Sequence, residues 1–164
     1  MIKYVLMNES HILPIAELEK CCFSDPWSVN SITSELNNPL SLWVVAVDGE
    51  ELVGYVGSQS VLGWADMMNL AVAPEYRRKG IGEELVNQLI VHLLKNEVSC
   101  LTLEVRSSNE PAITLYEKMG FCEVGRRPNY YHNPKEDALI LRKEWKVCKY
   151  WLWNPLVMKP RWPL

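Results

Sequence analysis

Three cations followed by two glycines form the stretch of this chain best suited to holding a ligand, Arg77-Arg78-Lys79-Gly80-Ile81-Gly82. It follows an apolar, strand-like run at residues 67–72 and precedes a segment with helical apolar periodicity. Unpaired N–H groups at a helix start carry partial positive charge, and glycines let phosphate oxygens approach the main chain. The junction therefore predicts a phosphate site. The alternative is a basic turn that only ends a loop.

Size and charge limit the other kinds of site. The chain has 164 residues, 48% of them hydrophobic, which suits one core and is short for two domains. With a net charge of −3, the protein lacks the positive field of a nucleic-acid binder, so no direct nucleic-acid partner is expected. No apolar run approaches the roughly 18 residues of a membrane span, and no leader opens the chain. We therefore expect a soluble, cytoplasmic protein without membrane contact.

The cysteines do not suggest a metal site or a disulfide framework. There are five, and they show no C-x-x-C spacing and no flanking histidine pairs: Cys21, Cys22, Cys100, Cys122 and Cys148. Reduced thiols are the expected state, and no metal is predicted.

The elements that must position the basic turn include both strands and helices. Apolar patterning and turn residues predict strands at residues 4–6, 42–47, 51–58, 66–72, 101–106, 121–124 and 138–141. Helices are predicted at about residues 8–22, 28–36, 80–96 and 109–119, with Ser28 and Asn109 as N-caps. The polar and aromatic residues 126–132 are expected to form a loop between the last two strands. The class is α/β or α+β, with a mixed sheet of six to seven strands and about four helices.

Two segments allow more than one interpretation. Pro26-Trp27 between the first two helices is either a rigid corner over the core or a lip that contacts substrate. Residues 144–164 carry four of the seven tryptophans and three prolines. This tail either covers the domain or a neighbouring subunit, or is an unstructured extension. We predict a domain at residues 1–143 followed by this tail, and the sequence leaves the oligomeric state open.

Several motifs downstream of the basic turn identify a family. They are Leu103-Glu104-Val105-Arg106, then Asn109, then Leu115-Tyr116-Glu117-Lys118-Met119-Gly120-Phe121, and finally Asn129-Tyr130-Tyr131. With the turn, they resemble the GNAT acetyltransferases, and among these most closely the bacterial ribosomal-protein alanine N-acetyltransferases. The resemblance covers about residues 3–143 and implies a GNAT fold.

This resemblance implies acetyl-CoA as co-substrate. The pyrophosphate would lie on the turn and helix start formed by Arg77, Arg78, Lys79, Gly80, Ile81, Gly82 and Glu83. The pantetheine amides would pair with the backbone of Leu70, Ala71 and Val72, and the N–H of Val72 would hold the oxyanion. Asn109 would contact the cofactor arm. A helix cap is its other role, and the two are compatible.

The resemblance also assigns the acid and the base. An α-amino group is mostly protonated at neutral pH and must lose a proton before it attacks. Glu104 matches the family's proton acceptor, and burial in a cleft could raise its pKa; the alternative is a surface carboxylate. Tyr116 matches the family's proton donor for the leaving thiolate, and the alternative is an ordinary core tyrosine.

The acceptor in such relatives is a protein N-terminus framed by two loops, which here contain Trp27, Tyr130 and Tyr131. Pro128 replaces an arginine that often precedes Asn-Tyr-Tyr, which leaves the acceptor preference less defined. We predict transfer to the N-terminal alanine of a ribosomal protein, small-subunit protein eighteen. The alternatives are another amine acceptor or a non-catalytic acyl-CoA-binding module.

Overall fold

The computed structural model describes residues 1–145, and the remaining tail, residues 146–164, lies outside the described residues. The seven strands are β1 Ile2–Leu6, β2 Ser41–Asp48, β3 Glu51–Val61, β4 Trp64–Val72, β5 Cys100–Arg106, β6 Cys122–His132 and β7 Lys135–Glu144. The four α-helices of the described part are α1 Ile12–Cys22, α2 Val29–Leu36, α3 Ile81–Lys95 and α4 Glu110–Lys118. Short 3-10 turns occupy Glu9–His11 and Pro74–Tyr76. The predicted mixed fold with about four helices is confirmed.

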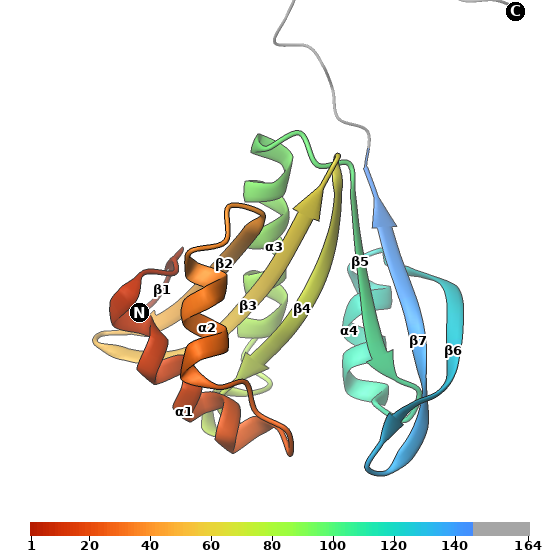
Figure 1. Ribbon diagram of the computed structural model, residues 1–164, viewed down its shortest axis with the longest axis horizontal. Coiled ribbons are helices and arrows are strands. Elements are labelled where there is room, and N and C mark those ends of the chain that lie inside the picture. The colour runs from red at the N-terminus through yellow and green to blue at the C-terminus, as the bar shows by residue number, and fades with distance from the viewer. Residues whose placement is uncertain (146–164) are drawn as a thin grey trace, which may run out of the picture.

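One sheet runs through the molecule in the order β1-β2-β3-β4-β5-β7-β6, with helices on both of its faces (Figure 1). Successive strand residues point to opposite faces, so Trp43 and Val44 of β2 belong to different cores. The core beside α3 contains Leu85 and Leu89, and the core beside α1 and α2 contains Ile15 and Ile32 with Trp43.

The sheet opens between its two central strands, β4 and β5. These strands are parallel and pair only at residues 64–66 with residues 100–102, after which they diverge (Figure 1). On its other side, β4 stays paired with β3 down to Val72, apart from a bulge at Met68. The rest of the β4 edge that faces β5 therefore has no strand partner among the described residues, and its backbone is available to a ligand.

Local sequence signals explain most element boundaries. Ser28 caps α2 by accepting a hydrogen bond from the Ser31 N–H (3.1 Å). Asp48-Gly49 closes the β2–β3 hairpin, where Gly49 has a positive φ of 64°. Gly80 precedes α3 with φ 80°, a backbone conformation that favours glycine.

The prediction of a loop at residues 126–132 is wrong, because these residues belong to β6. β6 pairs with β7 from Cys122 to His132, and the turn lies at Asn133-Pro134. β6 is an edge strand whose residues are almost all exposed, so it has no apolar alternation, and register shifts interrupt it twice. The two expected short strands are therefore one long, irregular hairpin.

The end of the described chain packs against the sheet. The Trp145 backbone N–H donates to the Ser99 carbonyl (3.0 Å), and its indole Nε1 donates to the Val98 carbonyl (2.7 Å). No helix within residues 1–145 is long and apolar enough to cross a membrane.

Candidate active site

The glycine turn has the geometry of an anion site. Arg78 and Gly80 both have positive φ, 63° and 80°, directly before α3 begins. Turns with left-handed residues can present backbone N–H groups to an anion. A Cβ added to Gly80 would meet no atom within 4 Å, and one added to Gly82 would lie 3.7 Å from a Val72 methyl. Protein packing alone therefore does not require glycine at position 82, which leaves that space to a ligand.

The three cations of the turn have different contacts. Arg77 donates from Nε to the Val72 carbonyl (3.0 Å) and from Nη2 to the Cys22 sulfur (3.4 Å). Lys79 lies over the Tyr76 ring at 4.9 Å, and Arg78 is exposed. Arg77 thus ties the turn to the end of β4, which leaves Arg78 and Lys79 to supply charge to a ligand.

The unpaired edge of β4 offers main-chain groups at alternate residues. The Ala73 N–H donates to the Val53 carbonyl of β3, and bonding alternates along antiparallel strands. Ala71 therefore bonds toward β3, whereas the N–H and C=O groups of Leu70 and Val72 point away from β3. The Val72 carbonyl already accepts from Arg77, so the free groups are those of Leu70 and the Val72 N–H. The side chain of Ala71 is buried, and those of Leu70 and Val72 pack at the edge of the core.

Other predicted cofactor residues surround the start of α3. Glu83 forms an ion pair with Lys118 of α4 (2.7 Å), and Ile81 is buried in the core. Asn109 caps α4 by accepting from the Ala112 N–H (3.3 Å), so its helix-cap role is confirmed. A contact of Asn109 with the cofactor arm stays a prediction.

Glu104 lies on β5, across the opening from the free edge of β4. Its carboxylate is half-buried, and Oε1 is 3.0 Å from the Arg127 Nε of β6. The Tyr130 hydroxyl interacts with the same carboxylate, an interaction that raises the pKa of Tyr130 above its ordinary value. β5 alternates as predicted, with Leu103 and Val105 buried on the face opposite Glu104.

Tyr130 and Tyr131 complete a charged aromatic cluster with their neighbours. Their rings meet edge to face at 5.1 Å, Arg127 lies 5.5 Å from the Tyr130 ring, and Arg106 lies 4.1 Å from the Tyr131 ring. Burial raises the pKa of Tyr131, and the Glu104 charge raises it further. The structure therefore brings both predicted acceptor tyrosines to Glu104.

Tyr116 approaches this cluster from α4. Its side chain is buried against the Phe121 ring (5.5 Å between centroids), so it is also a core tyrosine. Burial raises the pKa of Tyr116 well above its ordinary range, and the neighbouring Tyr131 adds to the effect. The hydroxyl is protonated at neutral pH with or without this shift, and the raised pKa by itself makes it a weaker acid, so the donor role of Tyr116 stays a prediction.

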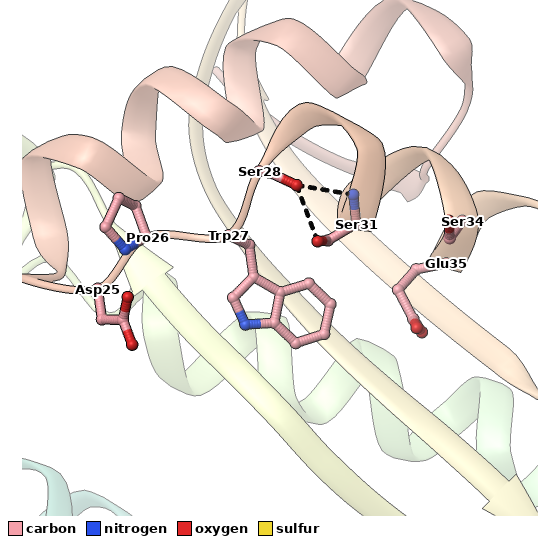
Figure 2. A pocket seen from close by; sticks show the side chains of 7 residues that line it. All are labelled: Asp25, Pro26, Trp27, Ser28, Ser31, Ser34 and Glu35. Carbon is pink, nitrogen blue, oxygen red and sulfur yellow. Dashed lines mark hydrogen bonds between the residues drawn. The ribbon is translucent and has the colours of Figure 1, made fainter.

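Trp27 lies between α1 and α2 and is partly buried. Its ring contacts Trp43 at 5.7 Å between centroids. Figure 2 shows an open pocket beside it, lined by Asp25, Pro26, Trp27, Ser28, Ser31, Ser34 and Glu35. Trp27 is thus a corner packed on the core that also borders an open surface, and its contact with substrate stays a prediction.

Two charged residues near these sites were missed by the sequence reasoning. Arg127 carries no sequence signal, because its partner Glu104 is remote in the chain and β6 has no periodicity. Glu19 did carry a sequence signal, since it occupies an inward position of α1 between Ile15 and Cys22. Within residues 1–145, no group of histidine, cysteine and acidic side chains is arranged to hold a metal ion.

An open sheet beside a glycine turn and the Glu104 cluster is the arrangement expected of a CoA-dependent acyltransferase. The chain belongs to the acetyltransferase (GNAT) family, whose model matches residues 12–121. It is 38% identical over 136 residues to the ribosomal protein bS18-alanine N-acetyltransferase of Escherichia coli K12, a match that covers 81% of this chain and 91% of the relative. The corresponding Haemophilus influenzae enzyme is 35% identical over 128 residues, covering 76% and 86%.

Solved structures agree with this assignment. The crystal structure of the ribosomal-protein-S18-alanine N-acetyltransferase from Escherichia coli superposes with a TM-score of 0.82 at 33% identity, covering 88% of this chain and 94% of that one. NAA60 of Arabidopsis thaliana, in complex with a bisubstrate analogue, shares the fold with a TM-score of 0.80 at 23% identity, covering 88% and 98%. This protein is therefore an N-acetyltransferase of the GNAT fold.

Proposed function

We propose that this enzyme transfers the acetyl group of acetyl-CoA to the α-amine of the N-terminal alanine of ribosomal protein bS18. The names of its relatives support this acceptor. The observation that carries the proposal is the position of Glu104 beside Tyr130 and Tyr131, across the opening from the unpaired edge of β4. A bacterial ribosomal protein as acceptor would place the reaction in the cytoplasm.

The glycine turn and the β4 edge would hold acetyl-CoA. The backbone of residues 78–83 would bind the pyrophosphate at the start of α3, with charge from Arg78 and Lys79. The main-chain groups of Leu70 would pair with a pantetheine amide, and the Val72 N–H would stabilise the oxyanion, since the Val72 carbonyl already accepts from Arg77. Leu70 and Val72 suit these roles because their free groups point away from β3, while those of Ala71 are used by β3.

The chemistry would proceed by direct transfer. Glu104 accepts a proton from the α-ammonium group, and the freed amine attacks the thioester carbonyl to form a tetrahedral intermediate. The nitrogen then loses its second proton to solvent as the C–S bond breaks and the amide forms. Tyr116 donates its proton to the departing CoA thiolate and is reprotonated from solvent. Trp27, Tyr130 and Tyr131 would frame the acceptor peptide on the two sides of the thioester.

A coupled assay tests this proposal. The chain is incubated with acetyl-CoA and short peptides that begin with alanine, serine or methionine, and with a peptide whose only free amine is a lysine. Free thiol is followed, and mass spectrometry locates the acetyl group. We expect thiol release with the alanine peptide and acetylation of its α-amine. Preferential acetylation of the lysine would assign another acceptor, and acetyl-CoA binding without release of thiol would indicate a non-catalytic module.

A further inference from the structure

Glu19 is a buried carboxylate that the proposed chemistry does not use. It lies on the inward face of α1, and only 1% of the residue is exposed. Removing a carboxylate from water is costly unless several donors surround it, and an apolar side chain would fill the same position without that cost. Its presence therefore calls for a function that an apolar residue could not perform.

Three donors from three different segments converge on Glu19. Its Oε2 accepts from the Trp27 backbone N–H (2.9 Å), in the segment that leads into α2. Its Oε1 accepts from Asn69 Nδ2 (2.8 Å) on β4 and from the Tyr55 hydroxyl on β3. Asn69 directly precedes Leu70, where the free edge of β4 offers its backbone. One carboxylate thus links the acceptor side of the enzyme to the strand proposed to hold the acetyl donor.

Aromatic contacts join Trp27 to Tyr55 by a second route. The Trp27 ring contacts Trp43 of β2 at 5.7 Å, and Trp43 stacks on Tyr55 at 5.3 Å with an interplanar angle of 13°. A Cβ on Gly57 would lie 2.5 Å from the Trp43 ring, so glycine is needed there for the stack to form. Trp27 is therefore held twice, by its backbone through Glu19 and by its ring through Trp43.

We propose that Glu19 is a positioning residue that fixes the Trp27 segment against β4 and thereby sets the affinity for the acceptor peptide. This inference rests on the proposed function, in which Trp27 borders the acceptor. Glu19 is buried and does not contact the reacting atoms. Its loss should weaken acceptor binding more than it slows the chemical step.

Two substitutions separate this role from a general effect on folding. Met has the length of Glu but no acceptor oxygen, so Glu19→Met should raise the acceptor KM by about tenfold or more. Glu19→Gln keeps one oxygen for the Trp27 N–H, and its NH2 can face a reversed Asn69 amide. We expect it to restore the acceptor KM to within about threefold of the unmodified chain, while kcat and the acetyl-CoA Kd stay within about twofold in both variants. An unchanged KM in Glu19→Met, or equal losses in the two variants, would overturn the inference.

A measurement on the unmodified chain covers the case in which Glu19→Met does not fold. Amide hydrogen exchange, resolved at single residues, should show the Trp27 N–H strongly protected because it is bonded to a buried carboxylate. Exchange of Trp27 at the rate of an unstructured amide would overturn the inference. This readout does not require activity, so absence of acetyl transfer to any peptide would reject the proposed function and leave the result at Trp27 intact.

Discussion

The Glu104 carboxylate and the Arg127 guanidinium form an ion pair across two strands, with Oε1 and Nε 3.0 Å apart. β7 lies between β5 and β6 in the sheet, so the pair spans a neighbouring strand. Both side chains are partly exposed, and such pairs contribute little to stability. The importance of this contact is positional, because it fixes the proposed base beside Tyr130 and Tyr131.

Replacing the base should stop catalysis without preventing cofactor binding. Glu104→Gln keeps the shape of the side chain but cannot accept the proton, so we expect kcat to fall by about 10²-fold or more. The acetyl-CoA Kd, measured by calorimetry, should stay unchanged. Glu123→Gln, on exposed β6, is the matched control and should retain full activity. Near-native turnover of Glu104→Gln would remove Glu104 from its role.

The two neighbouring arginines of β6 should behave differently. Arg127→Gln takes from Glu104 the side chain that orients it, and we expect kcat to fall by about three- to tenfold. Arg126→Gln is the control, because Arg126 pairs with Asp137 and Glu123 instead. Steady-state kinetics of the two variants provide the comparison. Equal kcat values for Arg127→Gln and Arg126→Gln would show that the Glu104–Arg127 pair has no catalytic role.

Tyr116→Phe should lower kcat by about tenfold or more, since it removes the proposed proton donor. It should also change how stability depends on pH. Burial raises the pKa of Tyr116 above its ordinary value of 10.0, so the folded chain keeps this proton when the unfolded chain loses it. The stability from Tyr116 is therefore complete below pH 10.0 and declines as the pH rises further.

Urea unfolding at pH 7, 9 and 11 measures this effect. The free energy of unfolding of the unmodified chain should fall relative to Tyr116→Phe only between pH 9 and 11, and the difference between the two should be constant below pH 9. A constant difference at all three values would contradict the assignment of a buried, protonated Tyr116.

Gly82→Ala tests the placement of the pyrophosphate. The added Cβ would lie 3.7 Å from the nearest protein atom, an ordinary contact, and alanine favours a helix more than glycine does, so the free energy of unfolding should not fall. It would instead meet the bound phosphates, and we expect the acetyl-CoA Kd to rise by about tenfold. Gly125→Ala on β6 also introduces only an ordinary contact, at 3.4 Å, and should leave the acetyl-CoA Kd unchanged. Unchanged affinity of Gly82→Ala would disprove this placement.

Local signals in the sequence predicted much of the fold. The caps at Ser28 and Asn109 and the Asp48-Gly49 turn each depend on a few neighbouring residues, and each lies where it was expected. β6 was not predicted in full because an exposed edge strand has no apolar alternation. The divergence of β4 and β5 depends on pairing between strands remote in sequence, which periodicity does not contain.

The candidate site was predicted only in part, because motifs identify single residues but not the contacts between strands remote in sequence. Motifs named Glu104, Tyr116, Tyr130 and Tyr131. The structure brings Tyr130 and Tyr131 to Glu104, and Tyr116 neighbours Tyr131. Arg127 was missed because its ion pair forms only when β5, β7 and β6 align. The catalytic and binding roles of all these residues remain predictions, and the tail at residues 146–164 lies outside the described structure.

The most direct test of the proposed function is acetyl transfer to a peptide with an N-terminal alanine, taken from the start of ribosomal protein bS18. Thiol release and the mass of the peptide are measured together. We predict one acetyl group on the α-amine for each CoA released, and no transfer to the same peptide with a blocked N-terminus. Undiminished transfer to the blocked peptide, or tight acetyl-CoA binding without any thiol release, would contradict it.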